Sequence, residues 1–359
     1  MTLNQLTLVF CLFYFSLQSQ NLKAIDSLMK LHEDNGFSGN VLYANKDSIV
    51  FKGSYGYANF EKEIKLNDDS KFDLASLSKQ FTAVSILMLI EQNKLQYTTD
   101  IKTIWPNLPY NGITIEHLLR HQSGLPDYMD FLEKKSYWDQ SKIATNQDII
   151  NLLTTNNFPL LFKSGTENRY SNTGYVVLAS IVEKLSETTF EEFLQKNIFT
   201  PLDMNNSKIV RRIYKPDNDS SLTVGYFKKG NKNKPNYLFN DELKIYDGIV
   251  GDGMIHTTTT DLYKWIKALK NNTLISKSNT EKMFSGDAIS SSTGFGLMIQ
   301  ESKSLGKYVL HTGNWQGYIN FMLYVLKSEE FVVILSNNSY EEYSLINNQL
   351  IKNGRQSTN

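Results

Sequence analysis

The distribution of proline is the sequence feature that most constrains the fold. All seven prolines lie between Pro106 and Pro235, so both ends of the chain are free of proline. Proline cannot donate a ladder hydrogen bond, and central strands therefore exclude it. We predict a sheet that takes its strands from both ends of the chain, with a proline-bearing insertion between them.

Residue patterns agree with this division. Apolar runs rich in β-branched and aromatic residues predict strands at 39–43, 48–57, 308–311, 318–326 and 331–336. Helical spacing predicts a short helix at 26–32, a closing helix at 341–351, and middle helices at 76–91, 114–120, 145–153, 173–185, 190–198 and 261–269. Three middle helices have a threonine at the expected N-cap, namely Thr114, Thr145 and Thr260.

The first residues indicate export. Residues 6–17 are almost entirely apolar, but this run is too short to span a bilayer, which needs about 20 residues. It is typical of a signal peptide, which we place at residues 1–19 with cleavage near Ser19; an uncleaved anchor or a buried first helix is the alternative. The single cysteine, Cys11, lies in this run, so a cleaved chain has no disulfide, thiol nucleophile or cysteine-ligated zinc. We expect a periplasmic or secreted protein without a stable membrane span once processed.

Charge excludes one large class of partners. The 37 basic residues balance the 37 acidic residues, so no net field attracts the chain to a polyphosphate backbone, and we expect no nucleic-acid partner. A hydrophobic content of 41% is that of a globular chain. At about 150 residues per domain, its 359 residues suggest two domains or one large domain with an insertion.

A serine followed three residues later by a lysine can form a nucleophile and base pair. The chain has three such pairs, Ser27/Lys30, Ser76/Lys79 and Ser304/Lys307, which is the number expected by chance. Only Ser76 begins a strongly apolar helix, where Lys79 falls on the same face and burial disfavours its ammonium form. The alternative is a structural lysine whose charge reaches solvent.

Two further motifs have a suitable context. Of four Tyr-x-Asn sequences, only Tyr170-Ser171-Asn172 lies in a loop directly before a predicted helix, where side chains can point into a site. His311-Thr312-Gly313 lies at the end of a predicted strand, and we expect its glycine to let a substrate approach the backbone.

Together, the three motifs resemble those of the serine β-lactamase and penicillin-binding-protein superfamily, in the branch of class C β-lactamases, D-Ala-D-Ala carboxypeptidases and related esterases. Their order matches, with separations of 94 and 141 residues, and the segments at 117–128, 251–253 and 294–297 add to the similarity. The resemblance implies an α/β (α+β) fold. Its antiparallel sheet is built from both chain ends (20–72 and 286–352) and flanked by helices. Between them we expect an all-helical insertion within a mainly helical domain (73–285), and a tail follows (353–359).

The resemblance also implies roles for the motif residues. Ser76 would attack an acyl carbon, while Lys79 and Tyr170 would move its proton. The groups implied to bind substrate or stabilise the oxyanion are Asn172, His311, Thr312, Gly313 and the backbone N–H of Asn314, together with that of Ser76.

Histidine at 311 departs from the lysine of class C β-lactamases and replaces a full charge by a group titrating near 6.5. His117 and His121 are four residues apart but have no accompanying glutamate, so we expect a structural role, with no metal and no cofactor. We expect the walls of the substrate pocket to come from residues 127–140 and 216–240.

These features predict an exported serine hydrolase that cleaves an amide or ester through an acyl-enzyme on Ser76, with a D-amino peptide, a β-lactam or a small ester as substrate. The alternative is a penicillin-binding-type sensing module that acylates without efficient turnover. The expected partner is a small-molecule or short-peptide substrate, and the expected state is a monomer.

Overall fold

A computed structural model describes residues 22–214, 217–229, 232–235, 243–340 and 342–358. The predicted signal peptide and its cleavage site lie outside the described residues. Among those described, no helix is long and apolar enough to cross a membrane.

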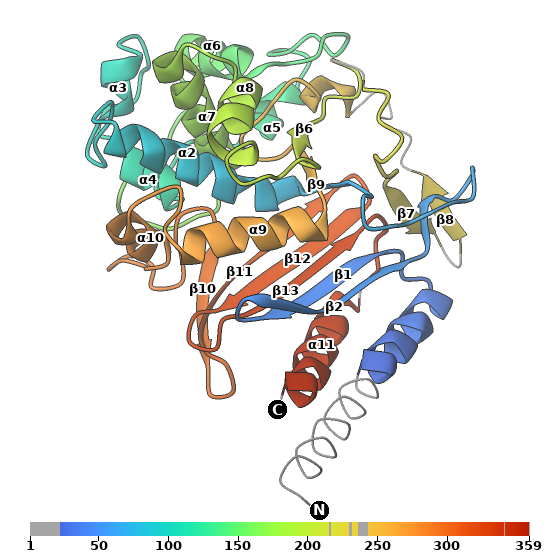
Figure 1. Ribbon diagram of the computed structural model, residues 1–359. Coiled ribbons are helices and arrows are strands. Elements are labelled where there is room, and N and C mark those ends of the chain that lie inside the picture. Colours follow the sequence, from blue (N-terminus) through green and yellow to red (C-terminus); the bar gives the residue numbers. More distant parts are fainter. Residues whose placement is uncertain (1–21, 215–216, 230–231, 236–242, 341, 359) are drawn as a thin grey trace, which may run out of the picture.

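One six-stranded antiparallel sheet joins the two ends of the chain (Figure 1). Its order is β10 (Met298–Ser302), β11 (Gly306–Trp315), β12 (Tyr318–Val325), β13 (Glu330–Ser336), β1 (Gly39–Asn45) and β2 (Ser48–Tyr55). The central pairing joins the first strand of the chain to the last, with Gly39 opposite Ser336 and Asn45 opposite Glu330. The expected sheet built from both chain ends is therefore confirmed.

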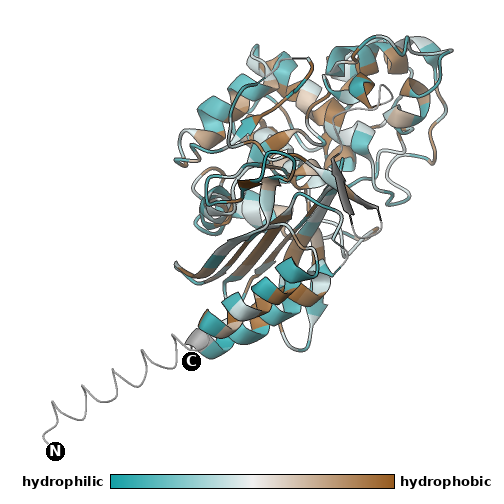
Figure 2. Cartoon of the chain, turned by 90° about the vertical axis from the view of Figure 1, so that its right-hand side faces the viewer, coloured by the Kyte–Doolittle hydropathy of each residue, from teal (hydrophilic) through white to brown (hydrophobic). Residues whose placement is uncertain are grey.

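Helices cover both faces of the sheet. Successive side chains of β1 enter different cores: Val41 and Tyr43 pack with Ile346 and Leu350 of α11 (Tyr343–Thr358), whereas Leu42 belongs to the larger core on the other face. The helix at residues 22–34 lies beside α11, and Figure 2 shows apolar strands between these helices and the rest of the molecule. Helix α9 (Thr259–Lys270) was expected in the helical part but packs on β1 and β13.

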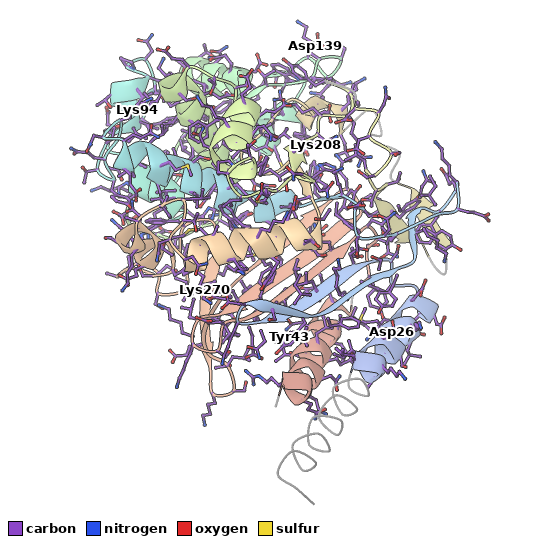
Figure 3. All side chains as sticks on the ribbon, viewed as in Figure 1. Asp26, Tyr43, Lys94, Asp139, Lys208 and Lys270 are labelled. Atoms are coloured by element: carbon purple, nitrogen blue, oxygen red, sulfur yellow. The ribbon has the colours of Figure 1, made fainter. Side chains whose placement is uncertain are left out.

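The C-terminal residues are not a tail. Helix α11 continues to Thr358, because Arg355 forms two hydrogen bonds with the buried Glu330 carboxylate, at 2.7 and 2.6 Å. Tyr43 also donates to Glu330 at 2.9 Å, and Figure 3 shows Tyr43 between the sheet and α11. This ion pair holds the last turns of the helix against the sheet, so the tail expected at 353–359 is wrong.

The central segment is mainly helical. Its helices are α2 (Lys79–Glu91), α3 (Ile101–Ile104), α4 (Ile115–Leu119), α5 (Tyr128–Leu132), α6 (Asn146–Asn156), α7 (Asn172–Ser186), α8 (Phe190–Leu194) and α10 (Lys277–Met283), with short turns η1 (Ala75–Ser78), η2 (Gln195–Phe199) and η3 (Lys244–Tyr246). Thr114 and Thr145 cap α4 and α6 as predicted, but Thr258, not Thr260, caps α9 by accepting the N–H of Asp261.

Short strands also lie outside the six-stranded sheet, and several of them are in the insertion. These are β3 (Tyr57–Asn59) with β4 (Ile64–Lys65), β5 (Phe72–Asp73) with β9 (Ile255–Thr257) and β6 (Lys208–Ile209), and β7 (Tyr226–Lys229) with β8 (Lys232–Pro235). The insertion is thus not all-helical. The β5–β9 pairing places the start of η1 next to the segment before β9.

Candidate active site

Ser76 lies in a tight turn between β5 and α2. Ala75, directly before it, is buried and has a φ of 49°, a left-handed conformation that costs a non-glycine residue about 1 to 3 kcal/mol. The N–H of Ala75 donates to the Asp73 carboxylate at 2.8 Å, and burial raises the pKa of Asp73 to about 6. Asp73 therefore stabilises the strained turn that presents Ser76.

Lys79 connects this turn to a second segment. As the first residue of α2, it is completely buried, and its Nζ donates to Ser76 Oγ at 3.1 Å and to the carbonyl oxygen of Asp252 at 2.9 Å. Thr82, one turn later, donates to the carbonyl oxygen of Gly251 at 2.6 Å and so fixes that segment on α2. The expected closeness of Lys79 to Ser76 is therefore present.

Tyr170 precedes α7, as expected, and lies beside the lysine. Lys79 Nζ is 4.9 Å from the centre of the Tyr170 ring. The Tyr170 ring also stacks on His121 at 4.6 Å between centres, and His121 Nδ1 accepts the N–H of Ser171 at 3.0 Å. His121 thus sets the position of Tyr170, a role that the sequence reasoning missed although it singled out this histidine.

His117 lies in helix α4, whereas His121 lies just after it. Helix α4 ends at Leu119, and His121 has a φ of 58°. His117 Nδ1 accepts the N–H of Thr114 in a capping box, while His121 contacts Tyr170. The structural role expected for His117 follows from this capping contact. The described residues contain no group of three His, Cys, Asp or Glu side chains arranged to hold a metal.

His311 is buried on β11 and faces the tyrosine, with ring centres 6.3 Å apart. Burial and the nearby Lys79 ammonium lower the pKa of His311 to about 4, and the same two causes lower that of His121 to about 3. Both imidazoles are therefore neutral near pH 7, and the contact of His311 Nδ1 with the carbonyl oxygen of Thr312 at 2.6 Å places the proton on Nδ1. The third motif supplies no positive charge at that pH.

The structure gives a different reason for a glycine at position 313 from the one expected. A Cβ at this position would lie 2.2 Å from the carbonyl oxygen of Leu74, so the glycine lets β11 pack on the turn that carries Ser76 rather than leaving room for substrate. The motif also lies within β11 and not at its end, because β12 pairs with the strand as far as Trp315. Strand β10 pairs only as far as Leu310, so residues 311–315 continue past its end.

A pocket of about 210 Å³ opens beside Ser76. Of the predicted residues, Ser76, Asn172 and Asn314 line it; further lining residues include Tyr128, Met129, Tyr246, Ile249, Asp252 and Trp315. Tyr128 and Met129 come from the expected wall at 127–140, but no described residue of 216–240 lines it. The sequence reasoning missed Tyr246, Asp252 and Trp315; Asp252 lies in a segment that supported the resemblance, and Trp315 directly follows the third motif.

A second hollow of about 260 Å³ lies on the side of Tyr170 and His311 and includes Ser292 and Thr293. Thr312 and Gly313 are on the adjoining strand but line neither space. Ser76 lines the first hollow and Tyr170 lines the second, and the Lys79 amine lies close to both side chains.

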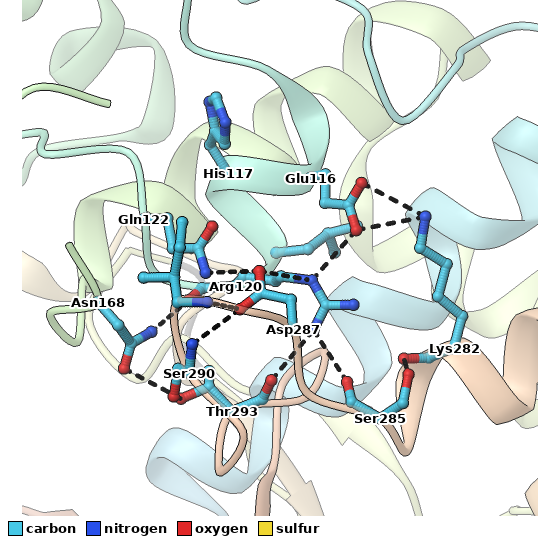
Figure 4. A network of polar contacts seen from close by, with 12 residues as sticks. Glu116, His117, Arg120, Gln122, Asn168, Lys282, Ser285, Asp287, Ser290 and Thr293 are labelled. Atoms are coloured by element: carbon cyan, nitrogen blue, oxygen red, sulfur yellow. Dashed lines mark hydrogen bonds and ion pairs between the residues drawn. The ribbon is translucent and has the colours of Figure 1, made fainter. Parts of the chain in front are cut away.

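A buried arginine fixes the wall of the second hollow (Figure 4). Arg120 donates to Glu116 at 3.1 Å and to the carbonyl oxygens of Ser285 and Thr293 at 2.9 and 3.1 Å, and Asp287 lies 3.5 Å away. Because charged hydrogen bonds to a buried group are costly to lose, this network holds the loop of residues 285–293 against α4.

Comparisons with known proteins agree with this geometry. The Beta-lactamase family model matches residues 24–356. Penicillin-binding protein 4* of Bacillus subtilis is 37% identical over 317 residues, which cover 86% of this chain and 69% of the relative. A penicillin-binding protein from Bacillus halodurans has a TM-score of 0.77 at 27% identity, covering 89% of this chain and 97% of that chain.

Two more distant structures share the fold. An octameric penicillin-binding protein homologue from Pyrococcus abyssi has a TM-score of 0.77 at 24% identity and covers 93% of this chain and 77% of its own. A D-amino acid amidase from Ochrobactrum anthropi, solved with D-phenylalanine, has a TM-score of 0.75 at 20% identity and covers 94% and 99%. With the family model matching almost the whole described chain, this protein belongs to the Beta-lactamase family, within the serine β-lactamase and penicillin-binding-protein superfamily of serine hydrolases.

Proposed function

We propose that this chain hydrolyses an amide or ester through an acyl-enzyme on Ser76. The observation that carries the proposal is the 3.1 Å contact between Lys79 Nζ and Ser76 Oγ, at the mouth of a pocket, with the Tyr170 ring beside the amine. A hydroxyl so placed has a base within reach for its proton.

In the acylation step, Lys79, after its ammonium has released a proton to solvent, takes the hydroxyl proton while Ser76 Oγ bonds to the substrate carbonyl carbon. The carbonyl oxygen becomes an oxyanion, for which the backbone N–H groups of Ser76 and Asn314 are the proposed donors; one such donor is worth on the order of 10² to 10³ in rate. As the bond to the leaving group breaks, Tyr170 gives that group a proton and recovers one from Lys79.

Deacylation reverses these transfers with water as the nucleophile. Water gives a proton to the Tyr170 and Lys79 pair and attacks the ester carbonyl, and Ser76 leaves with a returned proton. Asn172, which lines the same pocket, is the proposed contact for the acyl amide or for Lys79.

The neutral state of His311 bears on the choice among β-lactams, D-amino peptides and esters. A substrate carboxylate next to His311-Thr312-Gly313 would contact a neutral imidazole rather than a cation. This favours amides and esters whose leaving group carries no carboxylate. The D-amino acid amidase among the fold neighbours supports including amides of amino acids.

Labelling with a fluorophosphonate probe tests the nucleophile. We expect one covalent adduct on the native protein and none on Ser76→Ala, whereas Ser304→Ala, which alters another Ser-x-x-Lys serine at an exposed site, should label normally. Absence of any adduct on the native protein would refute the function. Product formation beyond one equivalent separates a hydrolase from the sensing module that acylates once.

Export and a monomeric state are part of the proposal. Residues 1–19 support the first, and the mass of the mature protein tests it, since cleavage near Ser19 removes the leader. Light scattering tests the second, for which the octameric fold neighbour supplies the contrary outcome.

A further inference from the structure

Three aromatic rings line the pocket beside Ser76, and the middle one, Tyr246, contacts the other two. Tyr128 and Tyr246 meet edge to face at 6.2 Å between centres, and Tyr246 meets Trp315 in the same way at 5.8 Å. These rings come from α5, η3 and β11, so three separate elements contribute an aromatic side chain to one pocket.

Carboxylates lie behind two of the rings. The Tyr128 hydroxyl donates to Asp252 at 2.9 Å, and the Tyr246 hydroxyl donates to Glu133 at 3.0 Å. Because each phenolic proton is donated to one of these carboxylates, the hydroxyl donors are not directed into the pocket. The rings therefore contribute their electron-rich faces to the pocket wall. Asp252 itself lines the pocket, and the negative charge of Asp127 acts on both Tyr128 and Tyr246.

Positive charge is missing from the same wall. None of the described residues that line this pocket is a lysine, arginine or histidine. Lys79 is the nearby cation, but its amine is held by Ser76 and by the carbonyl oxygen of Asp252. A carboxylate and aromatic surfaces without a cation form an environment that attracts ammonium groups and repels anions.

The placement of the two hollows decides which part of a substrate enters. If Tyr170 protonates the leaving group, that group lies in the hollow shared by Tyr170 and His311, and the acyl group lies in the pocket of Ser76. This step rests on the proposed function.

We infer that the protein selects acyl groups that carry a protonated amine next to the scissile carbonyl, as in amino-acid amides and peptides with a free N-terminus, and that Asp252 recognises the ammonium group. The Tyr128, Tyr246 and Trp315 rings enclose the rest of the acyl group. Asp252 is thus a specificity residue, and its carbonyl oxygen separately holds Lys79.

A matched pair of substrates tests the inference. D-Alanine p-nitroanilide and isobutyric acid p-nitroanilide have the same shape and differ by an ammonium group in place of a methyl group. We expect kcat/KM of the native protein to be at least about tenfold higher for the charged substrate. Asp252→Asn should lower kcat/KM for the charged substrate by about 10- to 100-fold, where each tenfold corresponds to about 1.4 kcal/mol. The neutral substrate should change less than about threefold, and the exposed Asp130→Asn should alter neither substrate.

Equal loss on both substrates would overturn the inference, because it would mean that Asp252 serves only Lys79 or the fold. Binding to Ser76→Ala gives a readout that needs no turnover. By calorimetry, D-alaninamide should bind at least about tenfold more tightly than isobutyramide, and adding Asp252→Asn should remove the difference. If both amides bind Ser76→Ala equally, the inference fails even where the fluorophosphonate labels Ser76; if labelling fails while the amides still differ, the proposed function fails alone.

Discussion

The two buried histidines beside Tyr170 make the protein sensitive to mild acid. His311 and His121 have pKa values of about 4 and about 3 in the folded chain, because burial and Lys79 oppose their charged forms, against an ordinary value of 6.5. Between pH 6.5 and 4.5 the unfolded chain gains a proton on each histidine that the folded chain does not. Unfolding is therefore favoured as the pH falls.

The magnitude follows from the width of this window. Two pH units at 1.36 kcal/mol each give about 3 kcal/mol per histidine, or about 5 to 6 kcal/mol for both, on the scale of the whole stability of a domain. Asparagine is the conservative replacement at both sites. Its amide N–H can replace the Nδ1 donor of His311 to Thr312, and its oxygen can replace the Nδ1 acceptor of His121 for Ser171.

Urea unfolding followed by tryptophan fluorescence, repeated between pH 7.5 and 4.5, measures the effect. We expect the native protein to lose about 3 kcal/mol more than His311→Asn over this range, and similarly more than His121→Asn. Comparing each variant with the native chain cancels the contribution of the carboxylates. Equal losses in native and variant proteins, or an NMR titration of His311 near 6.5, would refute the assignment of neutral, buried imidazoles.

Three further changes have definite expected outcomes. Gly313→Ala should lower kcat by about 10² to 10³ with a stability loss of about 1 to 3 kcal/mol, because a methyl group 2.2 Å from the Leu74 carbonyl oxygen must push β11 from the Ser76 turn; unchanged turnover would contradict this. Between pH 4 and 6 the folded native chain keeps a proton on Asp73 that the unfolded chain releases, so the native protein should lose up to about 3 kcal/mol of stability as the pH rises. Asp73→Asn should remove this loss, and unfolding measured across the same pH range tests it. Arg355→Ala should cost about 2 to 4 kcal/mol in thermal unfolding, because it leaves the buried Glu330 carboxylate without its cation, and a Tm change below about 2 °C would refute that account.

Proline and periodicity predicted the sheet because both report on backbone hydrogen bonding. Strands at both chain ends need donors at every position, and this requirement is visible in the sequence as the absence of proline before Pro106 and after Pro235. The end of α11 could not be predicted in this way. Arg355 extends the helix through an ion pair with Glu330, 25 positions away, and local patterns contain no information on such a contact.

In the site, too, local contacts could be predicted from the sequence and long-range contacts could not. The contact between Ser76 and Lys79 is local, so the spacing of one helical turn was enough to predict it. The pocket walls are not local: Tyr128, Tyr246 and Trp315 meet only after three separate elements have packed. The positioning role of His121 was hidden for a similar reason, since its ring accepts the N–H of Ser171, 50 positions away, and stacks on Tyr170.

The balanced net charge of the chain conceals an uneven distribution at the site. Histidine in place of lysine at position 311 lowers the positive charge on the side of Tyr170, since burial keeps this imidazole neutral near pH 7. Asp252 adds a carboxyl group on the side of Ser76, in a pocket without a lining cation among the described residues; burial raises the pKa of this group, while the charge of Lys79 lowers it. Both differences disfavour anionic substrates and favour cationic ones, although they lie on different elements. A single selective pressure for an acyl group with a free amine accounts for the two together, whereas weakened β-lactam recognition accounts only for the first.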